Sequence, residues 1–141
     1  MIKIIPLFIL LISAPSFSQE SIVLSAESAT EKGISPIWPK CERSRQTPID
    51  CFANKLSTHI VRNFEYPDVA KKDQLSGTVV VDFIINKKGK VEVVDAKGAH
   101  RYLLQAAVKI IRAIPKMIPA KWGVKPIAVA YTVPITFRKP S

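Results

Sequence analysis

Two apolar stretches, separated by a short glycine-containing turn, limit the folds that this chain can adopt. In the first stretch the apolar residues recur at every second position: Val79, Val81, Phe83 and Ile85. This is the period of a half-buried β-strand. Gly89 is available for the left-handed position of a hairpin loop, and Val91 and Val93 continue the apolar face beyond it. The sequence therefore predicts a β-hairpin that begins after Gly77.

An amphipathic helix is predicted on each side of the hairpin. Thr47 and Pro48 are typical of an N-cap and a first helical position, and the first helix should end before Pro67, because the residue preceding a proline is pushed out of the α region. The second helix covers residues 101–114 and ends at Pro115. Its predicted buried stripe consists of Leu103, Ala107, Ile110, Ile111 and Ile114.

A last strand, residues 127–137, alternates apolar and small or polar residues. Pro134 has no N–H for a neighbouring strand, so we expect this strand to lie at an edge of the sheet. The small side chains of Ala128 and Ala130 should leave its outer side open to another backbone. The order helix-strand-strand-helix-strand predicts an α+β fold: a small three-stranded antiparallel sheet with two helices packed on one face.

The N-terminal residues indicate export. An apolar stretch from Ile4 to Ile12 follows Lys3, and Ser16 and Ser18 fit the small-x-small pattern before a signal-peptidase cut. Because a membrane span needs about 20 apolar residues, we expect a cleaved signal peptide at 1–18 and a periplasmic protein. An uncleaved inner-membrane anchor facing the periplasm is the alternative. We expect a flexible polar lead-in at 19–35 and one domain at 36–141.

The charge is strongly positive and unevenly distributed. The net charge is +10, and residues 96–141 contain nine Lys or Arg but no Asp or Glu. One-signed surfaces attract anionic partners. Export argues against nucleic acid, which leaves acidic protein segments, cell-wall polymer or lipid head groups. A solubilising role of the lysines is an equally good interpretation.

The two cysteines and the scattered carboxylates argue against a catalytic or metal-binding site. Cys41 and Cys51 are the only cysteines of the chain, and an even number of cysteines in an exported protein predicts a disulfide. Because their spacing is not C-x-x-C, we expect this disulfide to be structural. Asp82, Glu92 and Asp95 are spread along the hairpin, and no serine or cysteine has an evident base partner. We therefore expect neither an enzyme nor a bound metal or cofactor.

Several motifs in this order resemble the C-terminal domain of TonB energy transducers. They are Tyr66-Pro67, Ala70, Gly77, Val79, Phe83, Gly89, Val91, Ala106 or Ala107, Pro115, Pro119, Lys125-Pro126 and the ending Tyr-Thr-Val-Pro-Ile-Thr-Phe. The match runs from Tyr66 onward, and more loosely from Pro36. The resemblance implies that Tyr66, Pro67, Gly77, Gly89, Pro115 and Pro134 shape the fold and its turns.

The resemblance also implies a function. TonB proteins couple a proton-driven motor to outer-membrane receptors, and a receptor segment adds as a strand beside the last strand of this domain. The expected partner-binding edge is Ile127, Ala128, Val129, Ala130, Tyr131, Thr132 and Val133. The family's proline-rich spacer is missing, its tryptophan after the second helix is Met117, and its Pro-Gly turn is Pro119-Ala120. We therefore expect a periplasmic TonB-like adaptor for receptor or other envelope-protein segments.

The sequence is compatible with two alternatives. A basic structural protein of the envelope could bind cell-wall polymer through its lysines, and such binding should collapse with ionic strength. A second copy of the chain, exchanging strands to form a homodimer, is a further candidate partner.

Overall fold

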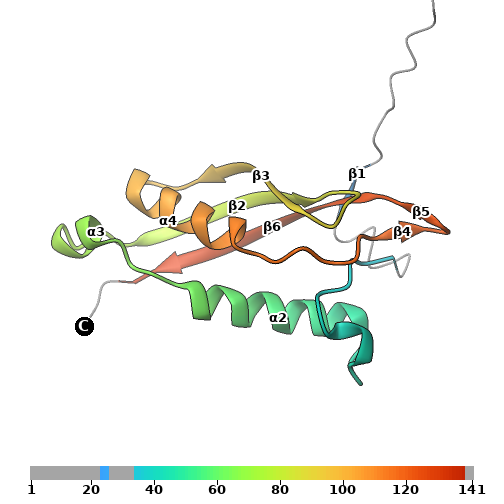
Figure 1. Cartoon of the computed structure of the whole chain (residues 1–141). Helices are drawn as coiled ribbons and strands as arrows, with labels where there is room; N and C mark the ends of the chain where they lie inside the picture. Colours follow the sequence, from blue (N-terminus) through green and yellow to red (C-terminus); the bar gives the residue numbers. More distant parts are fainter. Residues whose placement is uncertain (1–22, 26–33, 139–141) are drawn as a thin grey trace, which may run out of the picture.

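The computed structural model describes residues 23–25 and 34–138 (Figure 1). The predicted signal peptide at 1–18 lies outside these residues, as does most of the predicted lead-in. The elements are β1 (Val23–Ser25), η1 (Cys41–Arg43), α2 (Pro48–Asn63), α3 (Asp68–Lys72), β2 (Gly77–Ile85), β3 (Val91–Lys97), α4 (Arg101–Arg112), β4 (Lys121–Trp122), β5 (Lys125–Pro126) and β6 (Ala128–Phe137).

The predicted three-stranded antiparallel sheet is confirmed, with β2 at its centre. The hairpin partner β3 lies on one side of β2 and β6 lies antiparallel on the other, with Phe83 opposite Tyr131. The side chains of β2 alternate between buried and partly exposed, as the spacing of its valines predicts. Because neighbouring residues point to opposite faces, only one face of the sheet is buried.

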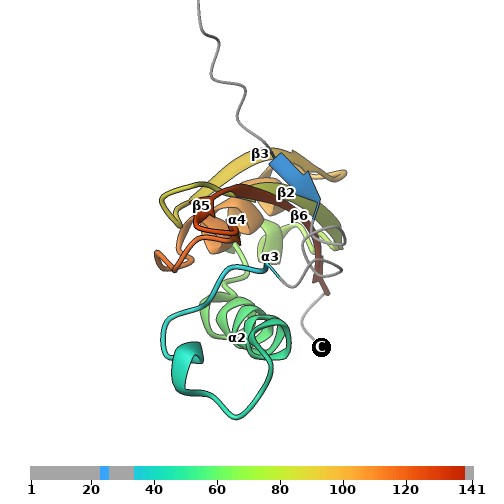
Figure 2. The same cartoon turned by 90° about the vertical axis from the view of Figure 1, so that its right-hand side faces the viewer.

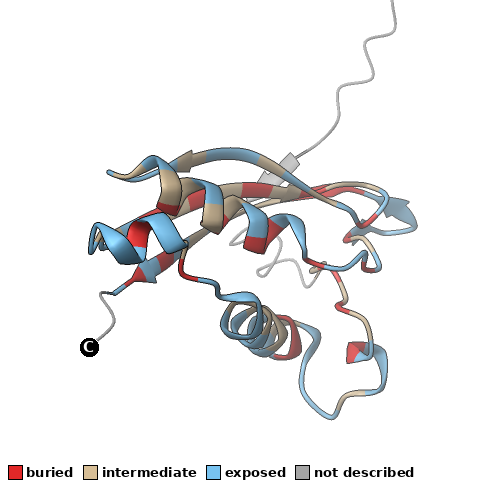
Figure 3. Ribbon diagram, turned by 60° about the vertical axis from the view of Figure 1, so that its left-hand side comes forward, coloured by how far each residue is buried: buried red, intermediate tan, exposed pale blue. Residues whose placement is uncertain are grey.

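The helices all cover that buried face (Figure 2). α4 packs on β2 and β3, and its predicted apolar stripe is buried. α2 packs on α4 and extends beneath β6, where the rings of Phe52 and Tyr131 stack at 5.0 Å. Buried residues lie on the sides of the sheet and helices that face each other (Figure 3). The two-layer α+β architecture is therefore the one predicted.

The start of α2 shows why the helix begins where it does. The Thr47 hydroxyl accepts a hydrogen bond from the Asp50 amide at 3.2 Å and donates to the Asp50 carboxylate at 2.7 Å. Pro48, at the first helical position, has no N–H that would need a partner. The predicted N-cap is confirmed.

The Cys41–Cys51 disulfide is confirmed and joins η1 to the first turn of α2, with the two Cα atoms 5.9 Å apart. Both cysteines are buried. The nearby Trp38 ring meets Phe52 edge to face at 5.8 Å. The bridge therefore holds the segment before α2 against the aromatic side of the core.

Removal of this bridge should weaken the fold without removing a reactive group. We expect the double variant Cys41→Ser/Cys51→Ser to lose about 2–3 kcal/mol of unfolding free energy, since the closed loop is short. Urea unfolding followed by tryptophan fluorescence measures this loss. If wild type and variant unfold at the same urea concentration, the bridge does not have this structural role.

Three short elements differ from the sequence expectation. The connection between α2 and β2, for which no element was predicted, contains α3, whose Ala70 is buried. A small hairpin, β4–β5, precedes the last strand. The third is β1: residues 23–25, expected in a flexible lead-in, pair in parallel with Ala128–Ala130 of β6. Their pairing partner lies more than a hundred positions away in the sequence, so no local signal marks these three residues as a strand.

Candidate docking edge

The backbone groups of β6 fall into two rows. Across the β2–β6 ladder, the Thr136 and Thr78 hydroxyls are 3.0 Å apart, and the Thr132 hydroxyl donates to the Asp82 carboxylate at 2.6 Å. Such close side-chain pairs are typical of the non-hydrogen-bonded pairs of an antiparallel ladder. Pro134, opposite Val80, is an even-numbered position like Thr132 and Thr136, and it has no N–H to bond to β2. The even-numbered residues of β6 therefore direct their backbone groups away from β2.

We call these even-numbered positions the outer row. It comprises Ala128, Ala130, Thr132, Pro134 and Thr136. Four of them keep an N–H, and none carries a charge. Thr132, Pro134 and Thr136 are exposed. The outer row thus offers donors and acceptors beside side chains that do not obstruct an approaching strand.

The odd-numbered positions form an inner row that fixes β6 to the domain. Val129, Ile135 and Phe137 are buried. The Tyr131 ring lies between Phe52 at 5.0 Å and Phe83 at 5.5 Å, stacked on both. Stacked aromatic pairs contribute about 0.5–1.5 kcal/mol each beyond their burial. The inner row therefore holds the outer row in a fixed position.

Burial raises the pKa of Tyr131 to about 12, because the apolar surroundings disfavour its phenolate. The unfolded chain loses this proton near pH 10, so Tyr131 should lower the stability as the pH rises from about 10 to about 12. We expect Tyr131→Phe to lose less stability than wild type between pH 8 and pH 11. Urea unfolding at both pH values measures the difference. Equal losses in the two proteins would contradict the assignment.

The opposite edge of the sheet is protected against strand addition. β3 carries exposed Glu92, Asp95 and Lys97, and its ladder with β2 is irregular beside Asp82 and Phe83. Asp95 also pairs with Lys97 at 3.7 Å. Edge charges and bulges are the features by which proteins avoid edge-to-edge pairing. Of the two sides of the three-stranded sheet, the β6 side is therefore the one suited to another strand.

The structure corrects the expectation that β6 is simply an edge strand. Val23–Ser25 pairs with Ala128–Ala130, so β6 lies between β1 and β2 over that length. Beyond Ala130, no strand within residues 23–25 and 34–138 covers the outer row. Ile127 lies just before β6, is buried, and donates its N–H to the Ala120 carbonyl at 2.9 Å. We therefore leave Ile127 out of the candidate edge.

Apart from Pro134, which belongs to the outer row, the residues expected to shape the fold and its turns lie outside β6. Tyr66 is buried against Phe137, with ring centroids 6.2 Å apart, and Pro67 stands at the N-cap of α3. Gly77 begins β2 and Pro115 follows α4. Gly89 adopts φ 80°, the left-handed conformation that the loop sequence predicts. These residues set the connections that bring β6 beside β2.

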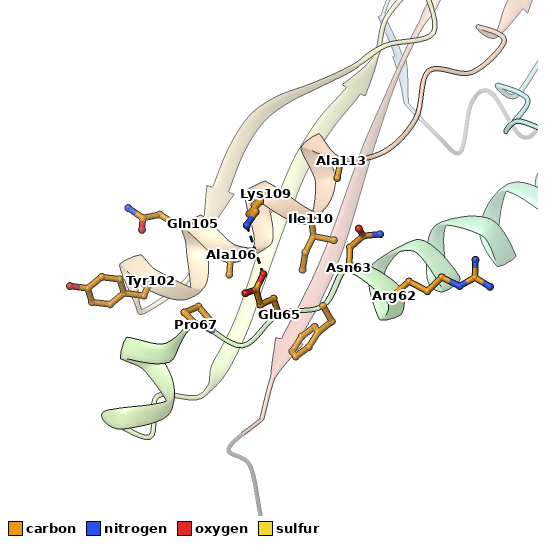
Figure 4. A pocket seen from close by; sticks show the side chains of 11 residues that line it. Arg62, Asn63, Glu65, Pro67, Tyr102, Gln105, Ala106, Lys109, Ile110 and Ala113 are labelled. Carbon is orange, nitrogen blue, oxygen red and sulfur yellow. Dashed lines mark ion pairs between the residues drawn. The ribbon is translucent and has the colours of Figure 1, made fainter.

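A shallow hollow of about 610 Å³ lies between the end of α2 and α4 (Figure 4). Glu65 and Lys109 face each other across it at 3.8 Å, and about 80% of each side chain is exposed. Exposed pairs of this kind contribute little free energy. The hollow therefore adds no buried ion pair to the site.

The titratable residues considered for catalysis have structural partners instead. Asp82 accepts from Thr132, Glu92 from Asn86, and Asp95 pairs with Lys97. His59 donates from Nε2 to the Ile110 carbonyl at 2.8 Å, which ties α2 to α4. Within the part of the chain that the structure describes, no group of three His, Cys, Asp or Glu could hold a metal ion.

The basic residues after position 96 are not all available to an anion. Lys97 and Lys109 pair with carboxylates, and Arg101 lies 5.2 Å from the ring centroid of Tyr102. The others come from separate places: the end of α4, the β4–β5 hairpin and the end of β6. In Figure 1 the hairpin and the end of β6 lie at opposite ends of the molecule. The basic residues of this stretch are therefore spread over separate parts of the described chain, as a solubilising role would have them.

The described residues form a small α+β domain whose sheet is uncovered along part of β6. The family described as Gram-negative bacterial TonB protein C-terminal matches residues 62–138. The chain belongs to this family, whose members act in TonB-dependent transport, interact with envelope proteins such as receptors, and lie in the periplasm of Gram-negative bacteria.

Two similar solved structures are NMR structures of the Helicobacter pylori TonB C-terminal domain. One, of residues 194–285, is 27% identical, with 61% of this chain and 91% of that chain covered and a TM-score of 0.45. The other, of residues 179–285, is 24% identical, with 70% and 89% covered and the same TM-score. No curated protein matches the chain. Among residues 23–25 and 34–138, no helix has the length and apolarity needed to cross a membrane.

Proposed function

We propose that this chain is a periplasmic TonB-like binding module. It docks extended segments of outer-membrane TonB-dependent receptors, or of other envelope proteins, by strand addition along the outer row of β6. The proposal includes export through a signal peptide cleaved after Ser18. Strand addition needs backbone groups rather than special side chains, which fits a site with no charged or catalytic residue.

The observation that carries the proposal is the contrast between the two sides of the sheet. The outer row of β6 presents uncharged residues and uncovered amides at Thr132 and Thr136, whereas β3 is charged and irregular. The inner row is fixed by the stacked rings of Tyr131, Phe52 and Phe83. A prepositioned edge loses little conformational entropy when a strand adds to it.

Site-specific photo-crosslinking in intact cells tests the proposal. A photoreactive residue at Thr132 should crosslink to an extended segment of an outer-membrane receptor or other envelope protein, identified by mass spectrometry of the joined peptides. The same residue at Val94, which is 62% exposed on β3, is the matched control and should not crosslink to that segment. Crosslinks to that segment from Val94 and not from Thr132 would place docking at the wrong edge and refute the proposal.

A further inference from the structure

The docking edge already holds a strand of this chain. β1 runs parallel to β6, with Val23 opposite Ala128, Leu24 opposite Val129 and Ser25 opposite Ala130. It is thus bonded to the part of the outer row nearest the start of β6 (Figure 1). Residues 26–33 connect β1 to the rest of the domain. A segment tethered so closely competes for the edge at a high effective concentration.

From this pairing we propose that Val23–Ser25 is an internal occupant of the docking edge, which a partner strand must displace. The inference rests on the proposed function and adds its regulation. Apparent affinity falls in proportion to the fraction of molecules whose edge is open. The Val23–Ser25 strand therefore limits nonspecific strand addition at Ala128 and Ala130.

The unequal lengths of the strands explain how displacement could proceed. β1 has three residues, whereas β6 has ten. A strand of three residues is at the short limit of those in folded proteins. A longer partner segment can pair first at Thr132 and Thr136, which β1 leaves uncovered, and then replace β1 at Ala130. The internal strand thus selects for partners that reach beyond the segment it occupies.

The ladder geometry identifies the β1 residue to change. Because the backbone groups of Val129 face β2, we expect the N–H and C=O of its partner Leu24 to lie against the outer-row groups of Ala128 and Ala130. Leu24→Pro removes that donor and should release β1. Val23→Pro is the matched control, since the N–H of residue 23 points away from β6, and the chain is already extended there.

The first measurement is amide hydrogen exchange in the full chain. In Leu24→Pro the Ala130 amide should exchange at least tenfold faster than in wild type, because its partner is gone. The Tyr131 amide, in the inner row, should not change in either variant, and Val23→Pro should resemble wild type. Unchanged exchange at Ala130 in Leu24→Pro would overturn the inference. Faster exchange on dilution of wild type would overturn it too, by assigning β1 to a second copy.

The second measurement uses a synthetic peptide carrying residues 20–27 of this chain, Glu-Ser-Ile-Val-Leu-Ser-Ala-Glu. It should bind Leu24→Pro at least tenfold more tightly than wild type. Equal binding to both proteins would overturn the internal occupant while leaving the docking edge intact. Binding to neither protein, with Ala130 released in Leu24→Pro, would mean that the edge accepts no added strand. That outcome would overturn the proposed function and this inference together.

Discussion

Gly89→Ala should lose at least about 3 kcal/mol of unfolding free energy, the largest loss expected from a single added methyl group in this domain. A Cβ at Gly89 would lie 1.7 Å from the Met117 carbonyl oxygen and 2.8 Å from its carbon. The Met117 amide donates to the Gly89 carbonyl at 3.0 Å, so the hairpin turn and the segment after α4 are held together. Relief of the clash would require breaking this contact.

Gly123→Ala is the matched control for this prediction. Gly123 has φ 63°, so alanine there carries the same left-handed backbone penalty, about 1–2 kcal/mol. Nothing lies within 4 Å of a Cβ at Gly123. Urea unfolding of both variants separates the clash from the backbone penalty. If the two variants lose equal stability, the close approach of Gly89 to Met117 does not constrain the fold.

The parts of the fold that the sequence predicted correctly depend on local signals. Thr47 and Pro48 mark the start of α2 within a few residues, and the alternation of β2 is visible without its partners. The hairpin needs only a short turn at Gly89. The short helix α3 could have been predicted too, because Pro67 and Asp68 suit a helix start.

β1 could not have been predicted in the same way. Three residues carry too little periodicity to distinguish a strand, and the partner Ala128–Ala130 lies at the other end of the chain. The sequence alone indicates that Pro134 lacks a hydrogen bond to one neighbouring strand, because proline has no N–H to donate. The division of β6 into inner and outer rows required the register with β2, and specifically the pairs of Thr132 with Asp82 and Thr136 with Thr78.

The second large effect concerns binding rather than stability. We expect Thr132→Pro to remain folded and to weaken partner binding by about fivefold to about 150-fold. Thr132 is exposed in the outer row, so proline there removes a donor offered to the partner and no bond to β2. A hydrogen-bond acceptor left without its donor on docking costs about 1–3 kcal/mol, and 1.4 kcal/mol corresponds to a factor of ten. Binding is measured with the segment identified by crosslinking.

Two controls isolate the backbone donor at position 132. Thr132→Val also loses the hydroxyl bond to Asp82 but keeps its N–H, so it should bind nearly as well as wild type. Val133→Pro places proline in the inner row, where it removes a bond to β2, and should unfold at a much lower urea concentration. If Thr132→Pro binds like Thr132→Val, the partner does not use the outer row at this position.

Docking along β6 can be measured by amide hydrogen exchange with the crosslinked segment supplied as a synthetic peptide. If an extended segment adds to β6, the Thr132 and Thr136 amides should exchange at least tenfold more slowly in the complex. The amides of Val133 and Ile135, already bonded to β2, should change little. Protection that appears along β3 or around the hollow between α2 and α4, with Thr132 and Thr136 unchanged, would contradict docking at the outer row of β6.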